Sequence, residues 1–219
     1  MNSKQPSRGE LTTITGPVQS AKSTDLRSIL IRKKSAGFNI RLIEHEKDTR
    51  YVTINETEED DCLRKSSTTH LGDRCGIHQS IISATLHDIP SNLLEDVDYI
   101  GIDEGQFFEV HLIPFVEEYL RKGVHVIVSG LLSDFNLEPF LNIQRLEIMA
   151  TTRISKLGTC NAEHRSGKRH VCGKDAPWSY KIGGDPSLNV EIGGPEMYRP
   201  VCPDCYFRLK KDEIKIVIQ

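Results

Sequence analysis

Short apolar runs alternate with segments of helical periodicity through the first 150 residues of the chain. The apolar runs predict buried strands at residues 11–15, 38–45, 97–103 and 124–132. Apolar positions three and four residues apart predict helices over residues 22–36 and 112–123, each with a glycine at its carboxyl end. Because strands and helices alternate, we expect an α/β fold in which a parallel sheet with right-handed crossovers is flanked by helices.

The pattern changes after Ala150. Cysteine, glycine and proline crowd into residues 158–205, and helical periodicity fades. We therefore predict an α/β domain over residues 10–150 and a smaller second domain over residues 151–207. Residues 1–9 are expected to form a disordered lead and the acidic residues 55–67 a solvated loop. The tail, residues 208–219, is consistent with a strand or with a frayed end.

Composition narrows the class of protein. The chain has 219 residues, of which 37% are hydrophobic and 27% charged, as is ordinary for a globular protein with its own core. A net charge of −3 does not favour binding to nucleic acid. No apolar run approaches the roughly 20 residues that cross a bilayer, and the polar N-terminus lacks a signal core. We expect a cytoplasmic protein without nucleic-acid or membrane partners, whose six cysteines are free thiols or metal ligands.

A sequence typical of phosphate-binding loops lies between the first predicted strand and helix. It follows the pattern G-x-x-x-x-G-K-[ST], except that Ala21 replaces the second glycine. In such a loop the backbone N–H groups and the helix N-terminus bind phosphate, the lysine reaches the β- and γ-phosphates, and the serine ligates Mg²⁺. The candidate residues are Gly16, Pro17, Val18, Gln19, Ser20, Ala21, Lys22, Ser23 and Thr24.

Ala21 predicts a weaker or slower site rather than an inactive one. The second loop glycine often has positive φ, and an L-residue in that conformation costs about 1–2 kcal/mol. This penalty corresponds to roughly five- to thirtyfold in nucleotide affinity.

An acidic pair follows the strand predicted at residues 97–103. Asp103 stands where a nucleoside-triphosphatase fold places the carboxylate on the metal side of the nucleotide. Glu104 is its neighbour. A solvated pair at the strand end is the alternative, but the apolar neighbours Ile102 and Phe107 oppose it.

Four cysteines of the second domain indicate a structural zinc site. Cys202 and Cys205 form a C-x-x-C turn, which presents two thiolates to one ion. Cys160 and Cys172 are the second pair, with a longer spacer that contains His164 and His170. Either histidine could replace a thiolate as ligand. A zinc ribbon for nucleic acid is disfavoured by the acidic balance and by the long α/β segment.

Three further stretches, together with the loop, the acids and the cysteines, point to one family. They are KDTRY (residues 47–51), IGIDEGQFF (100–108) and IGGPEMYRPVCPDCY (192–206). From about residue 10 to 207 the chain resembles the thymidine kinases that include the cytosolic cellular and poxvirus enzymes. The resemblance implies a P-loop NTPase-like parallel sheet and a small C-terminal zinc-and-lasso domain. It also implies transfer of the γ-phosphate of ATP to the 5′-hydroxyl of deoxythymidine, with deoxyuridine as a further candidate.

The resemblance also implies roles for individual residues. Glu104 matches the general base, Asp103 the metal-side acid, Arg50 an arginine near the transferring phosphate and Asp48 a polar neighbour. Phe107, Leu131 and Phe135 match apolar walls around the thymine, and Tyr198 matches a tyrosine that contacts the deoxyribose. The full nucleoside-binding set implied is Asp48, Gln106, Phe107, Leu131, Phe135, Ser179, Asn189, Val190, Glu191, Ile192 and Tyr198. ATP, Mg²⁺ and a structural Zn²⁺ are the implied cofactors, and the family usually forms homotetramers.

The chain also departs from the family pattern. Val18 and Gln19 replace a usual Met-Phe pair, Leu132 replaces an aspartate, and Glu191 brings a charge into the lasso. These departures leave open a second hypothesis, a weakened or inactive kinase-like subunit that binds nucleotide. The retained residues oppose it: Lys22, Ser23, Arg50, Asp103 and Glu104.

Overall fold

The computed structural model describes residues 8–46, 63–65, 79–162, 172–184 and 196–217. The chain divides into two compact units that are interleaved in sequence. One unit contains Met1–Ile14, Ser23–Gly130 and Leu141–Ile154, and the other contains Thr15–Lys22, Leu131–Phe140 and Ser155–Gln219.

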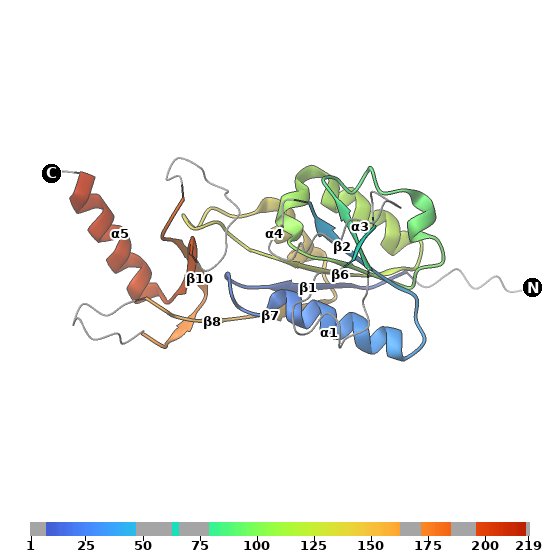
Figure 1. The fold of residues 1–219 in the computed structure, drawn as a ribbon, viewed down its shortest axis with the longest axis horizontal. Coiled ribbons are helices and arrows are strands. Elements are labelled where there is room, and N and C mark those ends of the chain that lie inside the picture. The colour runs from blue at the N-terminus through green and yellow to red at the C-terminus, as the bar shows by residue number, and fades with distance from the viewer. Residues whose placement is uncertain (1–7, 47–62, 66–78, 163–171, 185–195, 218–219) are drawn as a thin grey trace, which may run out of the picture. The chain divides into compact units, whose positions relative to one another are not determined.

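Within the described residues, a seven-stranded sheet has the strand order β3-β4-β2-β5-β6-β1-β7 (Figure 1). The bounds are β1 Leu11–Thr15, β2 Ile40–His45, β3 Leu63–Lys65, β4 Gln79–Ser83, β5 Tyr99–Ile102, β6 His125–Gly130 and β7 Thr152–Ser155. Strand β2 pairs in parallel with β4 and β5, and β5 pairs in parallel with β6. The predicted α/β fold with a parallel sheet is confirmed.

Backbone pairing gives the direction of the two edge strands, β7 and β3. The Thr151 N–H donates to Leu11 O, and the Lys156 N–H donates to Thr15 O. From the first of these bonds to the second, the residue number increases along both strands, so β1 and β7 run in parallel. At the other edge β3 pairs antiparallel with β4. The prediction of a solvated loop over residues 55–67 is therefore wrong for β3, whereas residues 55–62, 66 and 67 lie outside the described ranges.

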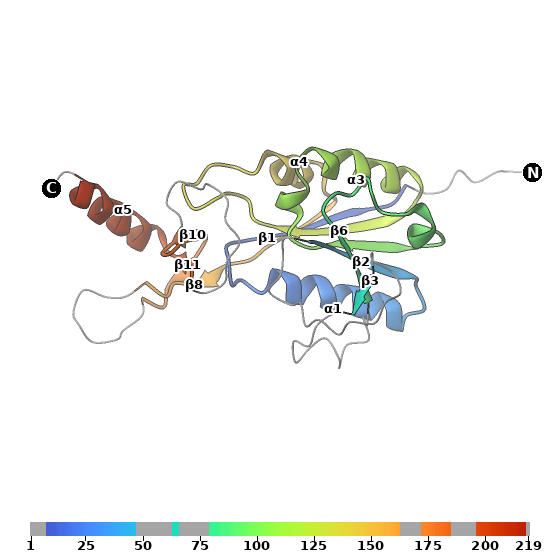
Figure 2. The ribbon, with the colours of Figure 1, turned by 45° about the horizontal axis from the view of Figure 1, so that its top comes forward.

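Helices cover both faces of the sheet. Helix α1 (Lys22–Ser35) lies on one face, and α3 (Leu112–Arg121) and α4 (Leu141–Met149) lie on the other (Figures 1 and 2). Short 3₁₀ helices span Ser91–Leu94 (η2) and Gly105–His111 (η3).

The packing of α1 explains why the sequence pattern predicts it well. Its Leu26 and Leu30 are fully buried. A Cβ on Gly101 of β5 would lie 2.6 Å from Leu30 Cδ1, so the glycine permits this close packing. Helix α1 ends at Ser35, and the predicted stop glycine follows it: Gly37 has φ +92 and its N–H donates to Lys34 O, while the Phe38 N–H donates to Lys33 O.

The second unit has small sheets and a terminal helix. Strands β8 (Gly158–Thr159) and β9 (Asp175–Ala176) pair antiparallel, as do β10 (Trp178–Lys181) and β11 (Tyr198–Val201). Helix α5 spans Pro203–Val217, so a strand or a frayed end is wrong for residues 208–217, whereas residues 218 and 219 lie outside the described ranges. None of the helices that the structure describes is long and apolar enough to cross a membrane.

Candidate active site

The phosphate loop, Thr15–Lys22, connects β1 to α1 and belongs to the second unit. Ala21 has φ 62, which confirms that this position requires the left-handed conformation, and Gln19 shares it with φ 57. The Lys22 side chain is buried and its Nζ donates to Pro17 O over 2.7 Å. The Ser20 hydroxyl donates to the same oxygen over 2.8 Å. The ammonium group is thus held against the loop itself, where the motif requires a cation for phosphate.

Other residues of the second unit hold the loop in place. The Val18 N–H donates to Ser179 Oγ over 3.1 Å, and Gln19 Nε2 donates to Tyr198 O over 2.9 Å. Gly16 admits no side chain, because a Cβ would lie 2.5 Å from Lys156 O. Ser179, expected at the nucleoside, therefore contacts the phosphate loop.

Asp103 follows β5 and is buried at 2% exposure. Its Oδ1 accepts hydrogen bonds from the Ser23 hydroxyl over 3.1 Å, from the Glu104 N–H over 3.0 Å and from the Ser129 hydroxyl. Among the described residues, no hydrogen-bond donor reaches Oδ2. The structure thus brings together Ser23 and Asp103, the two residues that the sequence analysis expects at Mg²⁺.

The electrostatics of Asp103 fit a cation site. Burial raises the pKa of Asp103 to about 6, and the charge of Glu104 adds to the rise, while the Ser129 hydroxyl opposes it. A buried carboxylate oxygen without a donor and a neighbouring hydroxyl are the hard oxygen ligands that Mg²⁺ accepts. A divalent ion on Oδ2 would remove the cost of burying this charge.

Glu104 lies directly beyond this acid in an unusual backbone conformation. Its φ and ψ are 49 and 47, in the left-handed region, and its side chain is buried. Gln106 Nε2 donates to Glu104 Oε2 over 2.6 Å and so fixes the direction of the carboxylate. Left-handed conformations of residues other than glycine persist where the surroundings impose them, often at functional sites. Here a Cβ on Gly105 would lie 2.6 Å from Val128 Cγ1, so the backbone after Glu104 is tightly confined.

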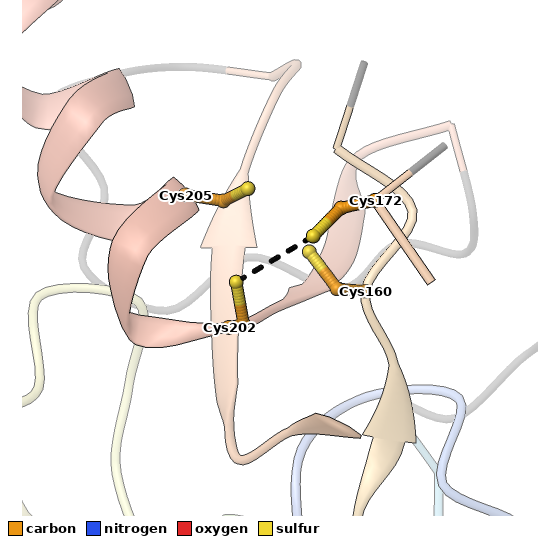
Figure 3. Close-up of side chains that lie close together, drawn as sticks. All are labelled: Cys160, Cys172, Cys202 and Cys205. Atoms are coloured by element: carbon orange, nitrogen blue, oxygen red, sulfur yellow. Dashed lines mark hydrogen bonds between the residues drawn. The ribbon is translucent and has the colours of Figure 1, made fainter. Parts of the chain in front are cut away.

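The four predicted zinc ligands come together in the second unit (Figure 3). The sulfur atoms of Cys160, Cys172, Cys202 and Cys205 all lie within 4.8 Å of one another. Four sulfurs at about 2.3 Å from one zinc ion lie roughly 3.8 Å apart at tetrahedral angles. Cys172 Sγ and Cys202 Sγ are 3.8 Å apart. The donor set and its spacing fit zinc.

The chain builds this cluster from strand ends and a helix start. Cys160 directly follows β8, Cys202 directly follows β11, and Cys205 lies in the first turn of α5. Burial raises the pKa of the Cys205 thiol to about 12, and that of Cys160 is raised for the same reason. Arg208 Nη2 donates to Cys205 Sγ over 3.6 Å. His164 and His170, the alternative ligands, lie outside the described residues.

Part of the expected nucleoside set also meets in the second unit. The rings of Phe135 and Tyr198 have centroids 6.4 Å apart. The Tyr206 hydroxyl donates to Phe135 O over 3.0 Å, and the ammonium groups of Lys181 and Lys210 lie 5.2 Å and 5.6 Å from the Phe135 centroid. Of the other expected nucleoside residues, some lie in the described part of the chain and some, like Arg50, lie outside it. Gln106 is buried and Phe107 and Leu131 are half-buried, whereas Asp48, Arg50, Asn189, Val190, Glu191 and Ile192 lie outside the described ranges.

The sequence profile of a family described as thymidine kinase matches residues 9–206. The chain belongs to the thymidine kinase family. It is 31% identical over 199 residues to the thymidine kinase of Myxoma virus (strain Lausanne), covering 91% of this chain and 97% of the relative. It is 31% identical over 206 residues to the cytosolic thymidine kinase of Homo sapiens, covering 94% and 76%. With the thymidine kinase of Pseudothermotoga lettingae the identity is 32% over 204 residues, covering 90% and 95%. The resemblance inferred from the sequence motifs is confirmed.

One ion pair close to Asp103 was not expected from the sequence. Arg27 of α1 and Glu44 of β2 form an ion pair through Nη2 and Oε1, and their side chains are only 13% and 9% exposed. The charge of Glu44 contributes to the raised pKa of Asp103. One signal was available, because Arg27 lies one helical turn after Ser23 and so shares its face of α1. Its partner on β2 could be known only from the pairing of β2 with β5.

Proposed function

We propose that this protein transfers the γ-phosphoryl group of ATP to the 5′-hydroxyl of deoxythymidine, with deoxyuridine as a further acceptor. One observation carries the proposal. In a member of the thymidine kinase family, the serine that ends the phosphate-binding motif, Ser23, hydrogen-bonds to a buried acid, Asp103, whose Oδ2 has no hydrogen-bond donor among the described residues. These two residues form a metal-binding half-site, and in the sequence Ser23 directly follows Lys22, the last residue of the phosphate loop.

On this proposal, each part of the loop and of the acidic pair has a role in phosphoryl transfer. The loop N–H groups and Lys22 bind the triphosphate, and Ser23 and Asp103 hold Mg²⁺, which neutralises charge on the phosphates when bound. A primary alcohol is a weak nucleophile, so a positioned carboxylate is required, and Glu104 takes the proton of the 5′-hydroxyl. Gln106 holds the Glu104 carboxylate in one direction. Arg50 is proposed to stabilise the transferring phosphate.

The nucleoside is proposed to bind through aromatic and backbone contacts. Phe107, Leu131 and Phe135 supply apolar walls, Tyr198 contacts the deoxyribose, and residues 189–192 read the base edge with their backbone. Phe135 is fixed for this purpose, because Tyr206 hydrogen-bonds to its carbonyl group. Asp48 completes the set as a polar contact.

Zinc, assembly and location complete the proposal. A structural Zn²⁺ on the four clustered cysteines stabilises the second unit, which has only a small core of its own. We propose a homotetramer in the cytoplasm, in keeping with the family and with the human relative that is named cytosolic. The inactive alternative is favoured by no specific observation, since Ala21 adopts the conformation that a glycine would supply.

A nucleoside-dependent assay of ADP release tests this function. We expect purified protein with ATP and Mg²⁺ to release ADP when thymidine is added, and to form thymidine monophosphate in equal amount. Replacement of Asp103 by Asn should remove the response, while the exposed Glu95→Gln serves as a control with unchanged turnover. ADP release that is independent of thymidine, or absent from zinc-loaded wild-type protein, would refute the proposed reaction.

A further inference from the structure

Two hydrogen bonds fasten the phosphate loop to the antiparallel pair β10–β11. The Ser179 hydroxyl of β10 accepts from the Val18 N–H over 3.1 Å, and Tyr198 O of β11 accepts from the Gln19 side-chain amide over 2.9 Å. Ser179 is 5% exposed, so its hydroxyl is set in the interior of the second unit. All four residues belong to this unit.

The loop backbone explains why such fastening matters. Gln19 and Ala21 are both left-handed, at φ 57 and 62, although neither is glycine. Each such residue is less stable in this conformation than in a right-handed one. External hydrogen bonds on Val18 and Gln19 hold the loop in the shape that a second glycine would otherwise make accessible.

Close packing around Gly158 also brings the phosphate loop and β11 near each other. A Cβ on Gly158 of β8 would lie 2.7 Å from Pro200 Cβ and 3.5 Å from Pro17 Cγ. Pro200 is the partner of Ser179 in the register of β10 and β11. Pro17 of the loop and Pro200 of β11 thus both lie close to Gly158 of β8, and the loop also bonds to β11 through Gln19.

Tyr198 connects the phosphate loop to the proposed nucleoside site. Its carbonyl oxygen accepts the Gln19 amide, and its ring faces Phe135 at a centroid distance of 6.4 Å. A triphosphate that orders the loop will thus order the backbone of the residue whose ring is expected at the deoxyribose. By thermodynamic reciprocity, a nucleoside that orders Tyr198 will favour the triphosphate-binding form of the loop.

We propose that Ser179 and Gln19 are positioning residues that fasten the phosphate loop to β10–β11 and so couple ATP binding to nucleoside binding. Ser179 supplies the anchor, and Gln19 supplies the connection to Tyr198. The coupling rests on the proposed function, whereas the anchoring concerns ATP alone. It also gives Gln19, a departure from the usual family residue, a role in this chain.

The size of each effect follows from the loss of one hydrogen bond. Removing a partly buried hydrogen bond of this kind weakens a binding equilibrium by about three- to tenfold. We expect Ser179→Ala to raise the Kd of a non-hydrolysable ATP analogue by that factor, and Ser179→Thr, which keeps a hydroxyl, to recover most of it. For wild-type protein we expect saturating thymidine to tighten the analogue by about fivefold or more. In Gln19→Ala this ratio should fall toward one.

Calorimetric titrations of the Mg²⁺–ATP analogue, with and without saturating thymidine, provide the test. The matched controls are Ser91→Ala and Gln144→Ala, which truncate exposed residues of the same types. Zinc content equal to that of the wild type shows that each variant retains the second unit. A merely structural role would lower stability without changing the ratio of the two Kd values.

Four results would overturn the anchoring role, the coupling or the proposed reaction. An analogue Kd for Ser179→Ala within twofold of the Ser91→Ala control would overturn the anchoring role. A wild-type protein that binds both ligands with a ratio of one, or a ratio retained in Gln19→Ala, would overturn the coupling and leave the proposed reaction intact. A wild-type protein that binds the analogue but not thymidine would overturn the reaction and the coupling together, while Ser179→Ala would still decide the anchoring.

Discussion

Replacing Ala21 by glycine removes one methyl group at one of the two left-handed non-glycine positions of the phosphate loop. Ala21 has φ 62 and an exposed side chain, so the methyl group contributes strain without burying a contact. The left-handed conformation costs an L-residue about 1–2 kcal/mol, and glycine does not incur this cost. We therefore expect Ala21→Gly to improve the site.

The expected gain divides between ATP affinity and fold stability. If the loop settles into this conformation when phosphate binds, the full 1–2 kcal/mol appears in binding, as about five- to thirtyfold tighter ATP. The free energy of unfolding changes less, because a glycine also makes the unfolded chain more flexible, at a cost of about 0.4–1 kcal/mol. ATP affinity is free of this opposing effect, since both bound and free protein are folded. The clearest signal is therefore in the Kd.

The assay measures the Kd of an ATP analogue and the free energy of unfolding on the same preparations. Ala36→Gly is the matched control, because Ala36 is exposed, lies outside the loop and is not among the residues with positive φ. It should lose stability by about 0.4–1 kcal/mol and keep its ATP affinity. If Ala21→Gly leaves the Kd unchanged or weakens binding, the strain at Ala21 does not limit nucleotide binding and the reasoning is refuted.

Other changes test the acids, the metal centre and the ion pair. Glu104→Gln should lower kcat by about 10²–10⁴ while thymidine Kd stays within about threefold; a kcat retained within threefold excludes Glu104 as the base. Cys202→Ser should reduce zinc from about one ion per chain to near none and lower the Tm, and unchanged metal content would show the ligand assignment to be wrong. Arg27→Met should destabilise the protein by about 3–5 kcal/mol because Glu44 stays buried without its partner. Adding Glu44→Leu should restore most of this loss, and denaturant unfolding that shows no rescue would contradict the pairing.

Local signals determined much of the fold. The β-branched run at Leu11–Thr15 and the helical spacing and terminal glycine of α1 predict elements whose bounds agree closely with the structure. Helix α5 was missed because its sequence pattern, rich in lysine and acids, gives weak local evidence, and its first turns are held by packing of Tyr206 against Trp178 and Tyr180. Strand β3 was missed because its place depends on pairing with β4, not on its own polar residues.

The sequence by itself determined which chemical groups the site contains: the phosphate-binding motif, the acidic pair and the four cysteines. Each is encoded by residue type at short spacing, because a turn, a strand end or a metal knuckle is a local structure. The tertiary structure alone decided what these groups contact. Ser179 faces the loop and Arg27 pairs with Glu44 because strand pairing and helix packing bring together residues that are far apart in the sequence. Side-chain partners across such distances depend on the fold of the whole chain, and no local pattern encodes them.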